Sequence, residues 1–340
     1  MIKKIFLYTI ISILFITAFL TYKVFGPSVK AKGTPYLFIK TGSGMSDVKK
    51  ELINKNFISS TIWFNQVSNL LKYKNVKPGR YKIPDGMSVY KLVRMLRNGF
   101  QTPVNLVITK LRTKEDFAKR AGNIFESDSL QLIQFLNSND SLKQFDVDTT
   151  TVMSLALPLT YTINWNSTPK KILQALHTAW KEFWTAERKQ KAKDKGLTPI
   201  QISILASIVD EETNKVIDRP NVASVYLNRI KKGMPLQADP TIKFAMRDFG
   251  LKRVLNVHLQ TPSPYNTYIN TGLPPGPICT PQIETLDAVL NAPETEYLYF
   301  VANRKFDGTH IFTTNYTDHL KYAKEYQTAL TIYLDSLKKN

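Results

Sequence analysis

The chain begins with a run of 18 residues, Ile5 to Tyr22, that carries no charged side chain and consists mainly of Ile, Leu and Phe. As a helix rising about 1.5 Å per residue, this run is about 27 Å long, close to the hydrocarbon thickness of a bilayer. Lys3 and Lys4 precede it, as is typical of a cytoplasmic N-terminus. We therefore expect a cytoplasmic tail at 1–4, a single transmembrane anchor at 5–22, and the remaining chain on the far side of the membrane.

A cleaved signal peptide is the main alternative for this run. Cleavage requires small residues at the exit of the apolar segment, whereas Ala18 is followed by the bulky sequence FLTY. Lysines also follow the run and weaken the orientation signal, namely Lys23, Lys30 and Lys32. An uncleaved anchor is favoured, and a buried core helix is disfavoured because the segment is apolar all round.

Positive charge is concentrated next to the predicted anchor. The 340 residues contain 46 Lys and Arg against 27 Asp and Glu, a formal net charge of +19. Residues 23–100 hold 15 basic and 3 acidic residues, a net of +12, whereas residues 101–340 hold 29 and 24, a net of +5. This distribution predicts an anionic partner near the membrane. Nucleic acid is disfavoured, because the body is expected outside the cytoplasm and no nucleic-acid-binding signature is present.

The residues that follow predict an α+β fold built from several parts. Residues 23–35 contain Gly, Pro and Lys without an apolar period and indicate a tether. Residues 36–100 predict a small module in the order strand, helix, helix, strand, helix, with Gly99 ending the last helix. Residues 101–195 begin with a strand at 104–108 and continue mainly as helices, in which Trp180 and Trp184 are expected to be core residues.

The segment 198–213, TPIQISILASIVDEET, is the most informative part of the chain. Thr198 followed by Pro199 is typical of a helix start. At 100° per residue, Glu212 falls near the middle of an apolar stripe formed by Ile202, Leu205, Ile208 and Val209, whereas Asp210 lies about 160° away. We therefore expect only Glu212, among the three adjacent acids, to point into the protein.

A carboxyl group in apolar surroundings has a raised pKa, because desolvation disfavours its charged form. A general acid that works near neutral pH needs such a pKa, so Glu212 is the candidate catalytic residue. The alternative is a frayed helix end, with all three acids solvated or one of them paired with Arg219 or Arg229.

Downstream segments predict a cleft rather than a metal or nucleotide site. Helices are expected at 219–233 and 240–248, with Asp239 as an N-cap before Pro240, and paired strands at 297–301 and 310–313 precede a last helix at 317–338. Proline-rich loops at 261–268 and 272–278 carry Tyr, Asn and Thr and suit a cleft for a sugar.

Other chemistries find no support in the sequence. It has no HExxH, GxSxG, P-loop or GxGxxG motif, its four histidines lack metal-ligand spacing, and Cys279 is its single cysteine, expected to be packed. We therefore expect no metal and no cofactor.

Six segments of the C-terminal region resemble the MltG, or YceG-like, endolytic murein transglycosylases. They are LASIVDEET (205–213), VASVYLNR (222–229), LQADPT (236–241), YNTY (265–268), GLPPGPI (272–278) and YLYFV (297–301). The resemblance implies a single-span inner-membrane protein with a LysM-like module at 36–100, an intermediate α+β segment at 101–195 and a transglycosylase catalytic domain at 196–340.

The resemblance also implies an activity and its residues. The family cleaves the MurNAc–GlcNAc β-1,4 bond of peptidoglycan without water and leaves 1,6-anhydro-MurNAc ends. Glu212 would then be the general acid and later the base, and the glycan would be bound by Gln237, Asp239, Tyr265, Asn266 and Tyr268. Implied partners are nascent glycan strands, the membrane and peptidoglycan synthases. The alternative function is a non-catalytic peptidoglycan-binding tether of the wall-synthesis machinery.

Three positions depart from the family pattern. Asp210 stands where the family usually has Glu, which suggests a supporting role at most. An acidic-Gly pair is replaced by Thr109-Lys110-Leu111-Arg112, and an acidic stretch near residue 155 by SLALPLT (154–160). These changes make a substrate contact from the middle segment doubtful.

Overall fold

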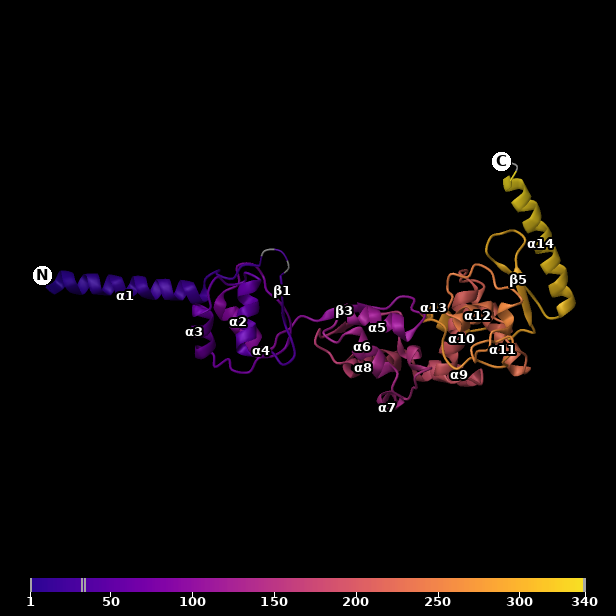
Figure 1. The fold of residues 1–340 in the computed structure, drawn as a ribbon, viewed down its shortest axis with the longest axis horizontal. Coiled ribbons are helices and arrows are strands. Elements are labelled where there is room, and N and C mark those ends of the chain that lie inside the picture. Colours follow the sequence, from indigo (N-terminus) through magenta and orange to yellow (C-terminus); the bar gives the residue numbers. More distant parts are fainter. Residues whose placement is uncertain (1, 32, 34, 339–340) are drawn as a thin grey trace. The chain divides into compact units, whose positions relative to one another are not determined.

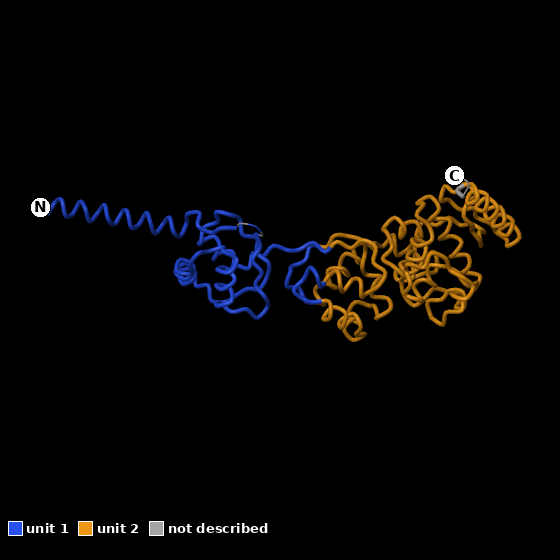
Figure 2. Tube along the Cα trace, turned by 45° about the horizontal axis from the view of Figure 1, so that its top comes forward, with its two compact units in different colours: residues 1–106, 122–128, 162–168 blue, residues 107–121, 129–161, 169–340 orange. Residues whose placement is uncertain are grey.

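The computed structural model describes residues 2–31, 33 and 35–338. Figure 2 shows that the chain divides into two compact units. Unit 1 consists of residues 1–106, 122–128 and 162–168, and unit 2 consists of residues 107–121, 129–161 and 169–340. Each unit has its own hydrophobic core.

The described residues form a mixed α+β fold with an N-terminal apolar helix, labelled along the chain in Figure 1. The strands are β1 (Tyr36–Ile39), β2 (Gly79–Lys82), β3 (Val104–Val107), β4 (Thr160–Ile163), β5 (Tyr299–Ala302) and β6 (His310–Thr313). The helices are α1 (Ile2–Phe25), α2 (Met45–Asn54), α3 (Ile62–Leu70), α4 (Val89–Asn98), α5 (Lys114–Gly122), α6 (Ser129–Leu136), α7 (Asn139–Leu142), α8 (Pro169–Phe183), α9 (Ala186–Asp194), α10 (Pro199–Glu212), α11 (Arg219–Lys231), α12 (Asp239–Met246), α13 (Ile283–Leu290) and α14 (Tyr316–Lys338), with short 3-10 helices at Lys143–Phe145, Val152–Leu155 and His258–Gln260.

Helix α1 is a candidate membrane span. It is 24 residues long, and no part of its most apolar window is buried inside the protein. It extends beyond the predicted limits of 5–22 at both ends, since it begins at Ile2 and ends at Phe25. The Phe25 ring packs against Tyr90 of α4, with 5.0 Å between ring centroids.

Unit 1 confirms the predicted order of strand, helix, helix, strand and helix between residues 36 and 98. Strands β1 and β2 pair antiparallel, with Tyr36 opposite Lys82 and Ile39 opposite Gly79. Helix α4 ends at Gly99, whose φ of 71° is the left-handed conformation that glycine adopts readily at a helix C-terminus.

Part of the expected tether at 23–35 belongs to this core. Val29 is 1% exposed, and its amide donates to the carbonyl of Met87 over 2.9 Å. The apolar side chain of Val29 therefore docks this stretch onto the module, which a sequence rich in Gly, Pro and Lys did not indicate. Residues 32 and 34 of the predicted tether, Lys32 among them, lie outside the described residues.

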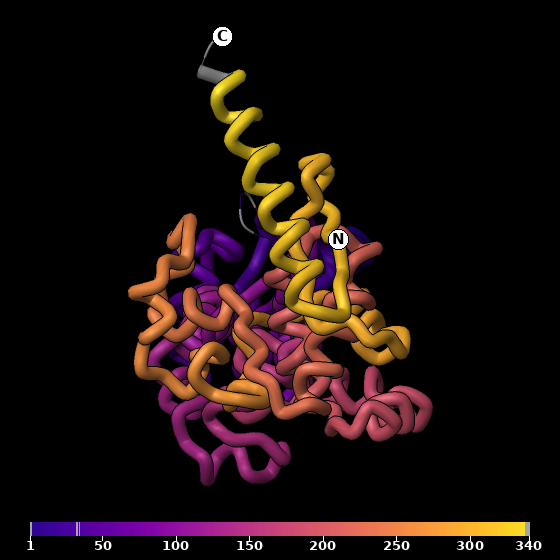
Figure 3. Tube along the Cα trace, turned by 90° about the vertical axis from the view of Figure 1, so that its right-hand side faces the viewer, coloured from indigo at the N-terminus to yellow at the C-terminus, as the bar shows by residue number. Residues whose placement is uncertain are grey.

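Unit 2 is organised around α10, which packs against α11, α12 and α13. The predicted hairpin is confirmed, since β5 and β6 pair antiparallel with Tyr299 opposite Thr313. The last helix, α14, packs against both of these strands, and Figure 3 shows its C-terminal turns extending beyond the hairpin. The core prediction holds for Trp184, which is 1% exposed, and Trp180 packs against the same core.

Candidate active site

Helix α10 places the catalytic candidate at its last residue. The side chain of its N-cap residue, Thr198, accepts a hydrogen bond from the amide of Gln201, and Pro199 occupies the first turn, as the sequence predicted. The helix ends at Glu212, because Thr213 adopts an extended conformation with φ −143° and ψ 135°. The Glu212 side chain therefore leaves the helix where its backbone hydrogen-bond ladder stops.

The expectation that only one of the three acids points inward is wrong. Asp210 is 3% exposed and more buried than its neighbours. Every residue of α10 from Ile202 to Asp210 is buried, because α11, α12 and α13 all pack against this helix, and Thr285 of α13 contacts Asp210 directly. A helix enclosed on all sides has no solvent face, so a helical wheel cannot distinguish its inward positions.

Glu212 lines a cavity of about 390 Å³. The hydroxyl of Tyr226 on α11 donates a hydrogen bond to Glu212 Oε1 over 2.6 Å. Burial and the neighbouring Glu212 raise the pKa of Tyr226 well above 10, so that its hydroxyl stays protonated and donates. The other lining residues are Arg229, Leu236, Gln237, Asp239, Tyr268, Tyr299, Phe300, Tyr316 and His319.

Burial raises the pKa of Glu212 to about 7. The hydrogen bond from Tyr226 stabilises the charged form and acts in the opposite direction, Asp239 raises the pKa further, and Arg229 lowers it. Desolvation dominates, as it does for other carboxyl groups in apolar pockets. Glu212 can therefore both release and accept a proton near neutral pH.

Arg229 ties the walls of this cavity together. It is 7% exposed and donates to the carbonyl oxygens of Leu298, over 2.7 Å, and Leu236, over 2.8 Å. Its guanidinium group also lies 5.2 Å from the ring centroid of Tyr299. One buried cation thus connects α11 to the segment before α12 and to the start of the hairpin.

Three of the predicted glycan-binding residues, Gln237, Asp239 and Tyr268, share the cavity with Glu212. Gln237 has a φ of 55°, a left-handed conformation that is costly for a residue other than glycine and is often found at functional sites. The Tyr268 hydroxyl donates to Asp239 Oδ1 over 2.6 Å. The prediction of Asp239 as an N-cap is wrong by one residue, since Ala238 is the N-cap and Asp239 begins α12.

The structure does not bring Tyr265 and Asn266 into this cavity. Asn266 is fully buried, and its side-chain amide donates to the carbonyl oxygens of Leu259 and Thr261. Tyr265 packs on Phe244, with 4.6 Å between ring centroids. Both residues stabilise the loop that places Tyr268 in the cavity.

Sequence reasoning missed several residues of the cavity, above all Tyr226, Arg229, Tyr299, Tyr316 and His319. Tyr226 and Arg229 are three apart on a predicted helix, which places them on one face, and this signal could have been used. The aromatic residues of β5 and α14 gave no such signal, because only the tertiary fold brings them to Glu212.

Stacked aromatic rings form one part of the cavity lining. The His319 ring stacks on Tyr299, at 5.4 Å and 30°, and on Tyr316, at 5.9 Å and 26°. Burial and Arg229 lower the pKa of His319 below its ordinary value, so the ring is neutral at pH 7. Such flat, partly exposed ring surfaces suit the apolar faces of sugars.

The described part of the chain contains no cluster of three or more His, Cys, Asp or Glu residues that could hold a metal ion. Cys279 is buried, and burial raises the pKa of its thiol well above the ordinary value. A thiol of this kind is a packed group and a poor nucleophile.

Comparisons with known proteins agree with one another. The profile of the YceG-like family matches residues 37–325. An endolytic murein transglycosylase of Bacillus subtilis (strain 168) is 29% identical over 315 residues, covering 87% of this chain and 86% of that protein. An endolytic murein transglycosylase of Streptococcus pneumoniae serotype 2 (strain D39) is 25% identical over 323 residues, covering 85% of this chain and 57% of its own length. A crystal structure of a YceG-like protein from Listeria monocytogenes superposes with a TM-score of 0.56 at 25% identity, covering 84% of this chain and 97% of that one.

Proposed function

The chain belongs to the YceG-like family, and from this premise we propose that it is a peptidoglycan lytic transglycosylase that cleaves glycan strands internally. The observation that carries the proposal is Glu212, whose pKa burial raises to about 7 in a cavity lined by aromatic and hydrogen-bonding side chains. The names of the relatives from Bacillus subtilis and Streptococcus pneumoniae support the same reaction.

In the proposed mechanism, protonated Glu212 donates its proton to the glycosidic oxygen between MurNAc and GlcNAc. The bond between C1 of MurNAc and this oxygen breaks, and the N-acetyl group of the substrate steadies the oxocarbenium-like intermediate. The 6-hydroxyl of the same MurNAc then attacks C1, and the Glu212 carboxylate accepts the hydroxyl proton. The products are a new GlcNAc 4-hydroxyl and a 1,6-anhydro-MurNAc end, and Glu212 is protonated again.

A single carboxyl group suffices for this reaction because the attacking group belongs to the substrate. Most glycosidases need a second carboxylate to activate water or to act as a nucleophile. Tyr226 holds Glu212 through a hydrogen bond of 2.6 Å, which fixes the orientation of the carboxyl group through both proton transfers.

We assign glycan binding to two sets of residues around Glu212. Tyr299, Tyr316 and His319 offer ring faces on which a sugar can stack. Gln237, Asp239 and Tyr268 offer hydrogen-bonding groups from the other lining segments. Tyr265 and Asn266 contribute indirectly, because they shape the loop that carries Tyr268.

The N-terminal part of the chain supports a location at the inner membrane with the catalytic domain in the periplasm. Helix α1 is long and apolar enough to span a bilayer, and two lysines precede its apolar core. Residues 36–100 form an antiparallel strand pair joined through two helices, which is the arrangement expected of a LysM-like glycan-binding module. Peptidoglycan synthases are the partners expected of an enzyme held where nascent strands emerge.

The test uses the full chain in detergent with uncrosslinked glycan strands and identifies product ends by mass spectrometry. We expect 1,6-anhydro-MurNAc ends from the wild type and none from Glu212→Gln. Reducing-end MurNAc would identify a hydrolase and overturn the mechanism. Equal behaviour of the wild type and the variant, in cleavage and in complementation, would favour a non-catalytic peptidoglycan-binding tether.

A further inference from the structure

The last turn of α10 has few restraints from the chain that follows it. The amide of Thr213 reaches the carbonyl of Val209 only over 3.4 Å. The residues from Asn214 to Ile217 are exposed, and helix ends of this kind fray and leave carbonyl groups without partners. A catalytic carboxyl group on the last residue of a helix therefore needs another element to hold it.

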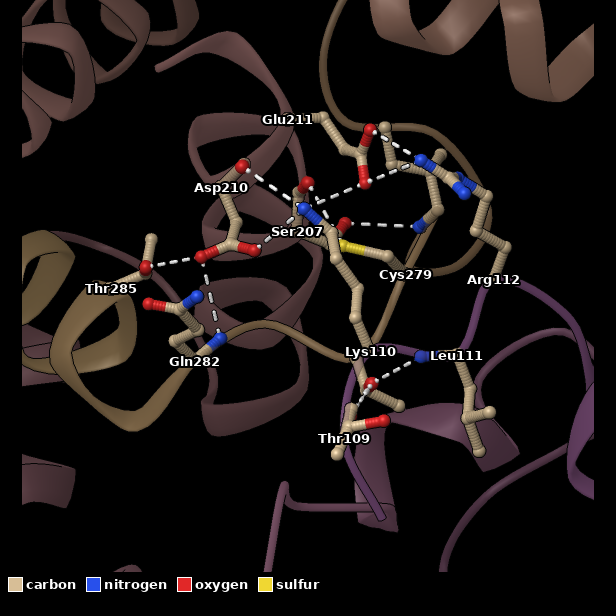
Figure 4. A network of polar contacts seen from close by, with 12 residues as sticks. Thr109, Lys110, Leu111, Arg112, Ser207, Asp210, Glu211, Cys279, Gln282 and Thr285 are labelled. Carbon is tan, nitrogen blue, oxygen red and sulfur yellow. Dashed lines mark hydrogen bonds and ion pairs between the residues drawn. The ribbon is translucent and has the colours of Figure 1, made fainter. Parts of the chain in front are cut away.

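Lys110, in the segment after β3, supplies such a restraint (Figure 4). Its Nζ lies 3.0 Å from Asp210 Oδ2 and 2.8 Å from Glu211 Oε1, and it donates to the backbone carbonyl of Asp210 over 3.2 Å. These contacts match the three donors of a lysine ammonium group. A cation at this position also interacts favourably with the negative end of the helix dipole.

Two further contacts extend this cluster. Arg112 Nη2 lies 3.2 Å from Glu211 Oε2, so that two cations hold one largely buried carboxylate. Asp210 Oδ1 accepts a hydrogen bond of 2.5 Å from the hydroxyl of Thr285 on α13. The last turn of α10 is thus held between the segment after β3 and α13.

The segment that carries Lys110 is itself fixed to α10 (Figure 4). Thr280 accepts from the amide of Leu111 over 2.9 Å and donates to the carbonyl of Thr109 over 2.9 Å. Two residues earlier, the amide of Ile278 donates to the Ser207 hydroxyl of α10 over 3.0 Å. The backbone around Lys110 and the helix that it contacts are therefore tied together through a second route, which makes the contact of Lys110 with the helix end rigid.

From this geometry we propose that Lys110, assisted by Arg112, is a positioning residue for Glu212: it holds the last turn of α10 through Asp210 and Glu211 and compensates the two negative charges that precede Glu212. The inference rests on the proposed function of Glu212. It also gives a role to the segment 109–112, whose departure from the family pattern had made a substrate contact doubtful. That segment contacts the end of α10 through Asp210 and Glu211, outside the cavity that Glu212 lines.

The charge of Lys110 bears on the pH dependence of the reaction. Glu212 faces charged and titratable groups from every element around its cavity, namely Glu211 on its own helix, Tyr226 and Arg229 on α11, Asp239 on α12, Tyr268, Tyr299 on β5, and Tyr316 and His319 on α14. Without Lys110, the charges of Asp210 and Glu211 lose a compensating cation. The charged form of Glu212 is then disfavoured, and its proton is retained to higher pH.

The test compares Lys110→Met, Lys110→Arg and the control Arg188→Met in the full chain. Arg188 forms a 3.1 Å ion pair with Asp287 between α9 and α13, with an exposure similar to that of Lys110. We expect Lys110→Met to lower kcat by about tenfold to a hundredfold, the range expected for a misplaced catalytic group. KM should stay nearly constant, and the falling alkaline limb of the activity profile should move to higher pH. Lys110→Arg should restore most of kcat, and Arg188→Met should leave both properties unchanged.

Hydrogen exchange of the amides at 208–213 provides a readout that does not need activity. We expect faster exchange in Lys110→Met than in the wild type and in Arg188→Met. An unchanged kcat, unchanged exchange, or a loss of activity without a shift of the alkaline limb would each overturn the positioning role. A wild type that makes no anhydro product would overturn the proposed function instead, and the exchange data would then decide on their own whether Lys110 holds the turn.

Discussion

The last turn of α10 carries two buried carboxyl groups, and the protein surrounds them in contrasting ways. Asp210 is enclosed by Lys110, Thr285 and the nearby Arg219, whose Nη2 lies 3.9 Å away. Glu212 faces a cavity and accepts one strong hydrogen bond from a neutral hydroxyl. Two residues apart, one carboxyl group is paired for structure and the other is left with too little compensation, so that its pKa rises to about 7.

This difference separates two kinds of buried acid. Burial alone does not, because Asp210 is the more buried of the two. Asp210 is a carboxyl group enclosed by cations and donors, and such a group contributes to the fold. A buried carboxyl group that lacks a cation in direct contact keeps its proton until higher pH and can transfer it.

The largest effect is expected from Asp210→Asn. The substitution removes the buried carboxylate that Lys110 and Arg219 contact. The free energy of unfolding at pH 7 should therefore fall by about 3–5 kcal/mol. Chemical denaturation of the full chain in detergent measures it. Asp287→Asn, which breaks the half-exposed pair with Arg188, should cost less than about 1 kcal/mol. Equal losses would show that Asp210 is not the structural acid.

Glu212→Gln should have the opposite effect on stability. The folded pKa of about 7 lies above the ordinary value of 4.5, so the wild type loses stability as pH rises from about 4.5 to 7, and the loss persists above 7. Because the amide does not titrate, the variant should exceed the wild type by about 3 kcal/mol at pH 8 and match it near pH 4. Denaturation curves at both pH values test this, and a constant difference would contradict the raised pKa.

Tyr226→Phe tests the role of the hydroxyl group that donates a hydrogen bond to Glu212. The hydrogen bond favours the charged form, so its loss should raise the pKa of Glu212 and move the alkaline limb of activity upward by about one pH unit. Activity at the optimum should fall about tenfold, because a hydrogen bond to a charged group contributes about 1.5–3 kcal/mol. As the control, Tyr161→Phe removes another buried hydroxyl, bonded to the carbonyl of Leu157 over 2.9 Å, and should leave the pH profile in place.

The smallest effect is expected at the edge of the cavity. Tyr316→Ala should raise KM for glycan strands about threefold to tenfold, because one aromatic stacking contact contributes about 0.5–1.5 kcal/mol. Tyr316→Phe keeps the ring and should stay within about twofold of the wild type. Tyr322→Ala on the same helix, outside the lining residues, is the matched control. A kcat effect without a KM effect would place Tyr316 in the chemistry instead.

The sequence predicted those parts of the site that lie within one element. The cap at Thr198 and the end of α10 follow from local patterns, and so do the hairpin and the last helix. The catalytic role of Glu212 stays a prediction. It failed where a distant segment covers a surface. The helical-wheel argument assigned Asp210 to a solvent-exposed face. Nothing in residues 198–213 shows that α13 packs against α10 and contacts Asp210 through Thr285.

The same limit explains the residues that were missed. Lys110 reaches α10 across a hundred residues of chain, and His319 reaches the cavity from the last helix. Neither position has a periodic pattern that indicates its partner. The residue types did carry a hint at 109–112, since two basic residues stand where the family has an acidic-Gly pair, but only the structure shows that their partners are acids on α10.

The position of Tyr316 and His319 on the last helix has a consequence for the order in which the cavity forms during synthesis and folding. Glu212 precedes α14 by about a hundred residues, so it is synthesised before α14. Until β5 and α14 fold onto the body, the side of the cavity formed by Tyr299, Tyr316 and His319 is open to water, and the desolvation that raises the pKa of Glu212 is incomplete. The raised pKa of Glu212 therefore forms late, only after the last helix has packed against the hairpin.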